Sequence, residues 1–303
     1  MPSQCFGHDT GDGHPECVER LRAVDEVLNA EVFAPLIRNN SGPATRMQLE
    51  RVHDAGYVSR ILACDGCNES VELDEDTVIS SGSIQAALYA AGAACQAVEE
   101  VMTGRARNAF CAIRPPGHHA EPARAMGFCL FNNAAIAALQ AREVHGATRV
   151  AVVDFDVHHG NGVQTIFWNE KNLFYASMHE QGGYPWTGFS EESGIADNIV
   201  NVPLPAGAVS DDLQYAWDSK IAPRLHEFTP ELIIVSAGFD AHYRDPLGGL
   251  NYATSDFGWL TKKIVEIANQ CCKGRVVSLL EGGYDLPSLA ASVEVHVKVL
   301  MEI

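Results

Sequence analysis

Three residues with metal-binding side chains follow two apolar stretches of the sequence. Asp156 and His158 come after one stretch, and Asp240 comes after the other. Residues two apart at a strand end point to the same side, so Asp156 and His158 can face one ion together. Two carboxylates and one imidazole leave a coordination position open for water and substrate, as a catalytic zinc site requires. The same oxygen-rich set also suits Fe2+, Mn2+ or Co2+, so the prediction is a catalytic site for a divalent metal.

A tandem pair of histidines, His118 and His119, follows Arg-Pro-Pro-Gly at the end of another apolar stretch. Asp154 and the amide of Asn161, on either side of the predicted metal ligands, can orient the two rings. An imidazole that donates to a carboxylate is held in one tautomer and becomes more basic. An amide raises the basicity less, so we expect the two histidines to differ in pKa and to divide the roles of base and acid.

Tyr284 follows Glu-Gly-Gly, in which the glycines permit a close approach of the backbone. A tyrosine there can present its hydroxyl to a developing oxyanion and add to the Lewis acidity of a metal. Each of these residues, taken alone, could have a purely structural role: an aspartate could cap a helix, a histidine could be buried in the core or exposed to solvent, and the tyrosine could fill space at the end of a strand. Because all of them follow predicted strands, the set indicates metal-assisted hydrolysis of an uncharged amide.

The elements that position these residues alternate between strands and helices. Short apolar, β-branched stretches predict strands at 109–113, 149–153, 173–177, 232–236 and 275–280. Amphipathic stretches predict helices at 83–101, 133–143, 211–228, 254–272 and 288–300, with Asp211 and Thr254 as N-caps. This alternation predicts an α/β fold with an open, mostly parallel sheet and helices on both faces. Ligands of such sheets bind beyond the carboxyl ends of the strands.

The composition narrows the class of protein. Among 303 residues, 21 Lys and Arg stand against 39 Asp and Glu, a formal charge of −18, and 47% of residues are hydrophobic. This is ordinary globular usage, and its acidity disfavours nucleic acid as a partner while attracting cationic substrates weakly. No secretory signal and no apolar run of about 20 residues is present, so we expect no membrane contact. Nine cysteines suggest reduced thiols and a cytoplasmic location.

Seven segments, in this order along the chain, resemble one known family. They are HPECVERL (14–21), HDAGYV (53–58), RPPGHHA (114–120), GFCLFNNAAIAA (127–138), DFDVHHGNG (154–162), SAGFDAHYRDPLGG (236–249) and LLEGGYDL (279–286). The family is the histone deacetylase and acetylpolyamine amidohydrolase superfamily, which shares the arginase-like α/β fold. The resemblance covers nearly the whole chain and implies one deacetylase catalytic domain over residues 1–303. Asn161 resembles the class II and bacterial enzymes, where class I enzymes carry Asp.

The resemblance implies two metal sites. Asp156, His158 and Asp240 would bind the catalytic Zn2+. A structural K+ would be held, largely through backbone oxygens, by Asp154, Asp156, His158, Ser177 and Met178.

It also implies the catalytic roles. We expect His119, oriented by Asn161, to be the general base and later the general acid. His118, held by Asp154, would be its electrostatic partner, and Tyr284 would polarise the acyl carbonyl. A low-activity branch of the family carries His in place of this tyrosine, so its retention implies active chemistry.

The substrate's lysine-like stem would occupy a narrow apolar tunnel. Phe128 and Tyr184 would form opposite walls, although the family more often has Phe at the second position. Gly127, Leu247 and Gly282 complete the predicted substrate-binding set. Leu247 stands where a polyamine-specific class II member has Glu, which weakens but does not remove the polyamine alternative.

Two substrate classes and two other functions stay open at this point. The expected substrate is an acylated lysine in a peptide or protein, and the alternative is an acetylated polyamine. A catalytically silent binding module would predict damage to the ligand set, and none is present. A manganese arginase-like enzyme would need further acidic ligands, and the histidine pair and EGGYDL do not fit it. The oligomeric state is not predicted.

Overall fold

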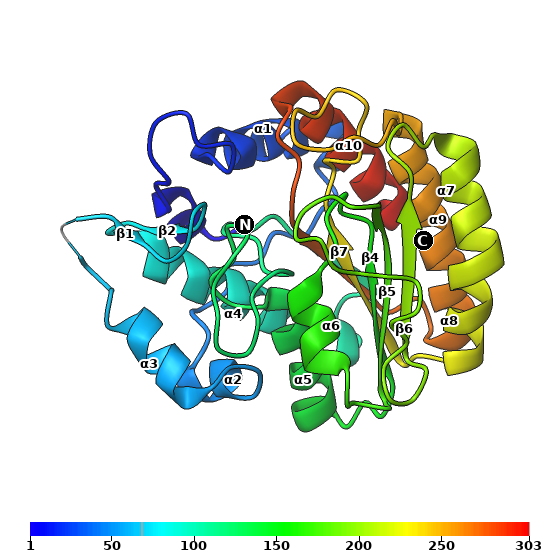
Figure 1. Ribbon diagram of the computed structural model, residues 1–303, viewed down its shortest axis with the longest axis horizontal. Coiled ribbons are helices and arrows are strands. Elements are labelled where there is room, and N and C mark those ends of the chain that lie inside the picture. The colour runs from blue at the N-terminus through cyan, green and yellow to red at the C-terminus, as the bar shows by residue number, and fades with distance from the viewer. Residues whose placement is uncertain (68, 303) are drawn as a thin grey trace.

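The computed structural model describes residues 1–67 and 69–302. Its centre is a six-stranded parallel sheet in the strand order β3-β8-β7-β4-β5-β6. Figure 1 labels β7, β4, β5 and β6 side by side. The strands are β3 (Asn108–Cys111), β4 (Val150–Asp154), β5 (Leu173–Glu180), β6 (Ile199–Leu204), β7 (Leu232–Ala237) and β8 (Val276–Leu280). The predicted α/β fold with a mostly parallel sheet is therefore confirmed.

The central strands are apolar because both of their faces are covered. β4 and β7 are buried along their whole length, as expected for strands that lie between two helical layers. Of the six strands in this sheet, β6 is the one that the sequence analysis does not predict. Its residues alternate between buried and half-buried, and it contains Pro203. Proline cannot donate to a neighbouring strand, so it suits this position at the edge of the sheet.

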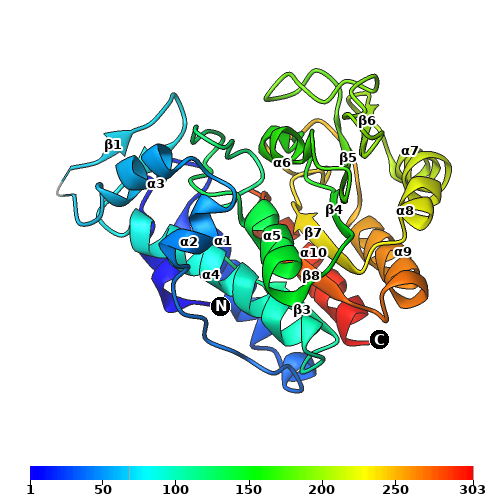
Figure 2. The same cartoon turned by 90° about the horizontal axis from the view of Figure 1, so that it is seen from below.

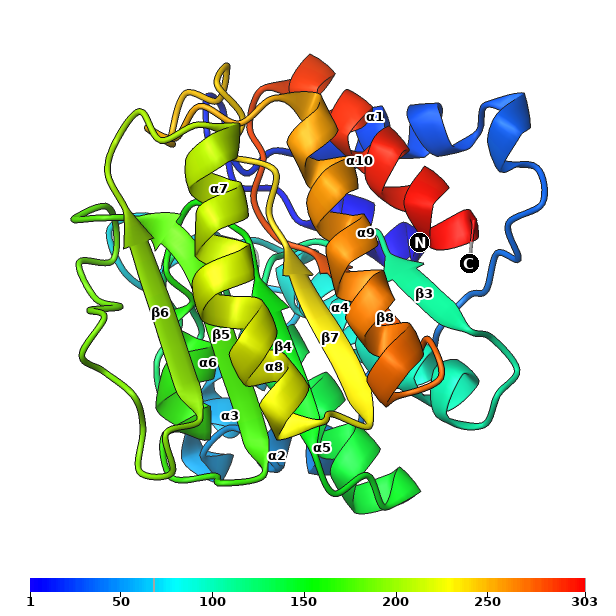
Figure 3. The ribbon, with the colours of Figure 1, turned by 90° about the vertical axis from the view of Figure 1, so that its right-hand side faces the viewer.

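Helices cover both faces of the sheet (Figure 3), which lies between two helical layers in Figure 2. α4 (Ser83–Met102), α5 (Asn133–His145) and α6 (Asn161–Phe167) lie on one face. On the other face lie α7 (Ser210–Ala216), α8 (Ala222–Phe228), α9 (Thr254–Cys271) and α10 (Leu286–Met301). α1 (Val18–Leu28) packs on α10. Within the described residues, no helix combines the length and apolarity that a membrane span requires.

The predicted N-cap of α9 is wrong by one residue. Thr254 is the first helical residue, and Ala253 occupies the cap position. The backbone N–H of Ala253 donates to Oδ2 of Asp256 at 2.8 Å. No side chain at the cap position accepts a first-turn N–H, and the helix start is instead fixed by Asp256, which binds the backbone of the cap residue.

The predicted helix over 211–228 is three segments rather than one. A π-helical stretch, Trp217–Ile221, lies between α7 and α8. Asp211 is not the N-cap of α7, because that position belongs to Val209. As in α9, the cap backbone N–H donates to a carboxylate in the first turn, here Asp212 at 2.9 Å.

The chain before β3 forms short elements that the sequence analysis leaves unassigned. They are the 3-10 helices η1 (Ser3–Gly7) and η2 (Glu31–Phe33), the helices α2 (Arg46–Glu50) and α3 (Ala55–Leu62), and the strands β1 (Val71–Glu72) and β2 (Val78–Ile79). β1 and β2 form an antiparallel hairpin. The hairpin presents Thr77, whose Oγ1 accepts a hydrogen bond from the backbone of Phe128 at 3.1 Å.

The register of the sheet brings the ends of the central strands to one level. Asp154 of β4 is in register with Ser236 of β7 and Ser177 of β5, and Ser236 is in register with Leu279 of β8. The segments that follow β4, β7 and β8 therefore begin side by side at the carboxyl edge. These segments carry most of the side chains for which the sequence predicts chemistry.

Candidate active site at the carboxyl edge of the sheet

Asp156, His158 and Asp240 lie together. Each offers one ligand atom, and these atoms all lie within 4.8 Å of one another. Nδ1 of His158 is 3.1 Å from Oδ1 of Asp156 and 3.2 Å from Oδ2 of Asp240. Across the described residues, no other group of three or more His, Cys, Asp or Glu side chains is arranged to hold an ion. The structure thus brings the three predicted metal ligands into one cluster.

The electrostatics of this cluster fit a divalent cation. Asp156 and Asp240 are almost fully buried, and two buried carboxylates in one place repel each other unless a positive charge lies between them. Burial, and after it the charge of Asp156, raises the pKa of Asp240 to about 7. A dication held by the two carboxylates and the imidazole would remove this repulsion, so the donor set suits a metal such as Zn2+.

Backbone groups fix both carboxylates. The N–H of Val157 donates to Oδ1 of Asp240 at 2.9 Å, and the N–H of Gly282 donates to Oδ2 of Asp156 at 2.8 Å. A Cβ atom at position 282 would lie 2.0 Å from Oδ2 of Asp240. Only glycine allows this approach, which explains the Glu-Gly-Gly sequence before Tyr284.

The two histidines of the tandem pair lie beside the cluster, with ring centroids 4.0 Å apart. Nδ1 of His118 is 3.0 Å from Oδ2 of Asp154, and Nδ1 of His119 is 2.8 Å from Oδ1 of Asn161. The structure contains both hydrogen bonds that the sequence analysis expects. One histidine faces a carboxylate and the other an amide, so the two rings have different electrostatic surroundings.

These surroundings move the two histidine pKa values in opposite directions. Burial alone would lower the pKa of His118, but the carboxylates of Asp154 and Asp156 raise it to about 10. Burial, together with the positive charges of His118 and His158, lowers the pKa of His119 well below 6.5. These shifts favour the imidazolium form of His118 and the neutral form of His119, which can accept a proton.

Tyr284 lies against a buried arginine. The guanidinium carbon of Arg20 is 4.8 Å from the centroid of the tyrosine ring, and its Nε donates to the carbonyl of Gly283 at 2.6 Å. Arg20 is itself paired at 2.8 Å with Glu16, which also pairs with Arg114. Burial raises the pKa of Tyr284 well above 10 despite the opposing effect of Arg20. The hydroxyl therefore keeps its proton and can act as a hydrogen-bond donor.

A cavity of about 240 Å³ lies over these groups. It is lined by Asp76, Pro116, His118, His119, Gly127, Phe128, His158, Tyr184, Leu247, Gly282 and Tyr284. The ring of Tyr184 is 5.1 Å from that of His119, and the ring of Phe128 is 6.0 Å from that of Tyr284. All five residues for which the sequence analysis predicts substrate contact therefore line one pocket with the histidine pair.

One wall of the pocket has a constrained backbone. Gly127 and Phe128 have φ angles of +56° and +67°, in the left-handed region. A Cβ atom at position 127 would lie 2.4 Å from Cδ2 of His119, so only glycine fits. Phe128 is an unusual residue at positive φ, and the hydroxyl of Thr77 and the ring of His14, 4.8 Å away, hold it there.

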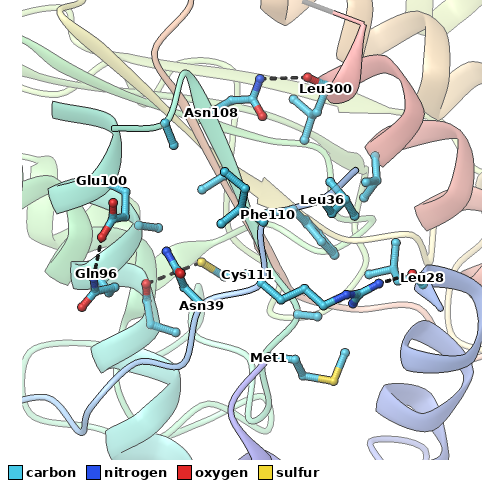
Figure 4. Close-up of a pocket in the computed structure, with 18 of the residues that line it drawn as sticks. Met1, Leu28, Leu36, Asn39, Gln96, Glu100, Asn108, Phe110, Cys111 and Leu300 are labelled. Carbon is cyan, nitrogen blue, oxygen red and sulfur yellow. Dashed lines mark hydrogen bonds between the residues drawn. The ribbon is translucent and has the colours of Figure 1, made fainter. Parts of the chain in front are cut away.

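A larger cavity of about 670 Å³ lies beside β3, at the edge of the sheet (Figure 4). Its walls include Leu36, Gln96, Phe110 and Leu300. It shares no lining residue with the smaller pocket, and none of the predicted site residues lines it. The chemistry that the sequence predicts therefore belongs to the smaller pocket.

Among the residues near the site that sequence reasoning missed are Asp76, Tyr175 and Glu281. Asp76, from the β1–β2 hairpin, lines the pocket. Tyr175 of β5 donates to Oδ2 of Asp154 at 3.0 Å. Glu281 accepts the backbone N–H of Gly117 at 2.7 Å, and burial raises its pKa to about 7. Of the three, only Glu281 had a signal in the sequence, because it directly follows a predicted strand. Asp76 and Tyr175 reach the site only through contacts with residues distant in the chain.

The fold and these side chains define a hydrolase of the deacetylase and amidohydrolase class. Residues 14–300 match the histone deacetylase domain, and the chain belongs to the histone deacetylase family. The class of enzyme that the sequence indicates is confirmed at this level.

Individual relatives agree with this assignment. Histone deacetylase 14, chloroplastic, of Arabidopsis thaliana is 38% identical over 312 residues, which cover 96% of this chain and 73% of that protein. A histone deacetylase-like amidohydrolase of Pseudomonas aeruginosa is 38% identical over 278 residues, which cover 90% of this chain and 73% of its own length. The crystal structure of the HDA15 HD domain matches with a TM-score of 0.94 at 36% identity, covering 100% of this chain and 87% of that one.

Proposed function

We propose that the protein is a Zn2+-dependent deacylase that removes acetyl or longer acyl groups from the ε-amine of lysine in peptides and proteins. The observation that carries the proposal is that His158, the histidine pair and Tyr284 all line one narrow pocket. Aromatic rings from Phe128 and Tyr184 give this pocket apolar walls, which suit the aliphatic stem of an acylated lysine.

The residues would divide the reaction as follows. Zn2+ held by Asp156, His158 and Asp240 would supply Lewis acidity toward the acyl carbonyl and the attacking water. His119, neutral because its pKa is lowered, would take a proton from the water and later deliver it to the leaving amine. His118, positively charged beside Asp154, would stabilise negative charge that develops on the substrate.

Tyr284 would act on the carbonyl oxygen. Its raised pKa keeps the phenol protonated, so the hydroxyl can donate a hydrogen bond that strengthens as the oxygen becomes an oxyanion. Such an interaction is stronger in the transition state than with the bound substrate, which makes it catalytic rather than a contribution to binding alone.

We also propose the structural K+ site formed by Asp154, Asp156, His158, Ser177 and Met178. Its support is the register of β4 and β5, which places Asp154 opposite Ser177. The ion would stabilise the segment between β4 and α6, which carries two of the predicted Zn2+ ligands. A cytoplasmic location stays a prediction.

An acetylated polyamine is the second candidate substrate. The observation in its favour is Asp76, a carboxylate among the residues that line the pocket and one that could attract a distal ammonium group. We favour the lysine substrate because Leu247, rather than an acidic residue, stands at the position that distinguishes the polyamine-specific relative.

The decisive experiment compares acetate release from an acetyl-lysine peptide and from N-acetylputrescine at equal concentration. Each substrate is tested with metal-stripped protein and with Zn2+ restored. We expect Zn2+-dependent release and a higher kcat/KM for the peptide. A higher kcat/KM for the polyamine would assign the enzyme to small-molecule metabolism. Release from neither, and none from peptides with longer acyl chains, would contradict the deacylase proposal.

The Tyr284→Phe variant tests the role of the tyrosine hydroxyl. Removing an oxyanion donor should lower kcat by about 10²–10³-fold while metal content and melting temperature stay near the wild-type values. The measurement is steady-state kinetics on the preferred substrate, with metal content determined by elemental analysis. Tyr215→Phe, on an exposed residue of α7, is the matched control and should leave kcat unchanged. Wild-type turnover in Tyr284→Phe would remove the tyrosine from the mechanism.

A further inference from the structure

Asp245 is a buried carboxylate that the proposed mechanism does not use. It lies in the segment after β7, between the predicted ligand Asp240 and the pocket residue Leu247, and is only 8% exposed. Burying a carboxylate is costly unless hydrogen-bond donors satisfy it. Its donors therefore indicate what this charge does in the fold.

The N–H groups that donate to Asp245 come from two segments that are distant from each other in the chain, one around Tyr284 and one at Leu247. Oδ2 of Asp245 accepts the backbone N–H of Tyr284 at 2.7 Å and that of Asp285 at 3.3 Å. Oδ1 accepts the N–H of Leu247 at 3.0 Å. The carboxylate of Asp245 thus links the backbone of Tyr284 to the backbone of Leu247. Both of these residues line the pocket.

The backbone around Tyr284 is also held from other directions. On the carbonyl side, Arg20 donates to the oxygens of Gly283 and Glu281. On the C-terminal side of Tyr284, Asp285 caps α10 by accepting the N–H of Ser288 at 3.1 Å. The N–H of Tyr284 itself has Asp245 as its partner. The carboxylate therefore completes the set of contacts that orient this residue.

We infer that Asp245 is a positioning residue for Tyr284: its carboxylate holds the tyrosine backbone so that the hydroxyl meets the acyl oxygen. This inference rests on the proposed role of Tyr284. An asparagine cannot replace the carboxylate, because an amide has one acceptor oxygen and its NH2 group would face backbone N–H donors. The predicted consequence is a loss in the rate of the chemical step, since small displacements of a catalytic group are costly.

The test is a double-mutant cycle on the zinc-loaded full chain. Asp245→Asn should lower kcat by between about 10- and 100-fold, as expected for a displaced catalytic group. In the Tyr284→Phe background, the same change should alter kcat by less than about twofold, because the hydroxyl that Asp245 positions is already absent. Metal content and melting temperature are measured for all four proteins. If Asp245→Asn does not fold, Asp245→Glu replaces it in the cycle, since this variant keeps the charge and both acceptor oxygens.

Asp212→Asn is the matched control. Asp212 also accepts a backbone N–H, that of Val209 at 2.9 Å, but it is exposed at the start of α7. This variant should leave the kcat of each background, wild type and Tyr284→Phe, unchanged. A general structural effect of Asp245→Asn would instead multiply with that of Tyr284→Phe.

The outcomes separate the inference from the proposal on which it rests. Suppose first that Tyr284→Phe is impaired, so that the role of Tyr284 stands. The inference about Asp245 is then wrong if the losses of the two variants multiply, or if Asp245→Asn keeps wild-type kcat. If Tyr284→Phe alone keeps wild-type kcat, the role of Tyr284 is wrong and the inference about Asp245 fails with it.

Discussion

Asp240→Asn is expected to lose both bound metal and activity. The substitution keeps the size of the side chain but replaces an anionic ligand with a neutral amide, which binds a divalent cation less tightly. Changes to groups that only orient metal ligands already lower metal affinity by about 10–100-fold, so loss of a charged ligand should cost at least about 100-fold. Activity should fall to the level of the metal-stripped protein.

Two readouts distinguish metal loss from unfolding. Elemental analysis after dialysis should find the variant nearly free of Zn2+, while circular dichroism should show wild-type secondary structure. Asp211→Asn, on an exposed residue of α7, is the matched control and should retain both metal and activity. If Asp240→Asn keeps full metal content and turnover, Asp240 does not belong to the ligand set.

His119→Ala is expected to lower kcat by about 10²–10⁴-fold, the usual contribution of a general base, and to do more damage than His118→Ala. The reason is the pKa difference between the two rings. The lowered pKa of His119 favours its neutral form, which can accept a proton, whereas Asp154 and Asp156 raise the pKa of His118 despite its burial. The check is kcat for both variants and for His226→Ala, an exposed histidine of α8 that serves as control.

The pH dependence gives an independent readout of the same assignment. Because burial and neighbouring charges lower the pKa of His119, its protonation should not contribute a decline in kcat/KM as the pH falls through 6.5. The decline should begin only at lower pH, where His119 becomes protonated. The pKa of His118, raised to about 10, predicts a second decline as the pH rises through that value. A greater loss in His118→Ala than in His119→Ala would reverse the two roles.

Most strands of the parallel sheet could be predicted from the apolar runs in the sequence. Strands buried on both faces need apolar runs, and the four inner strands, β8, β7, β4 and β5, contain such runs. β6 could not be found this way, because this edge strand is only partly buried and its sequence, which contains Asn201 and Pro203, is no continuous apolar run. The helix starts were misplaced at Asp211 and Thr254 because apolar residues, Val209 and Ala253, occupy the N-cap positions, and an acidic residue in the first turn accepts the backbone N–H of each.

Local sequence alone determined which chemical groups this protein carries at the ends of its strands. Asp156 and His158 are two residues apart, His118 and His119 are adjacent, and Gly282 precedes Tyr284 by two positions. These relations depend on covalent spacing and on the periodicity of a strand, and both can be deduced without knowing the fold.

Tertiary structure alone decided which groups meet. Oδ1 of Asp245 and the N–H of Leu247 are local partners, but Tyr284 is 39 residues away from Asp245. The links between Glu281 and Gly117 and between Arg20 and the carbonyl of Gly283 are longer still. Their partners are backbone N–H and C=O groups, which every residue carries, so no residue type marks them in a sequence. The packing of strands, helices and loops in the folded chain selects which of these groups meet each buried charge.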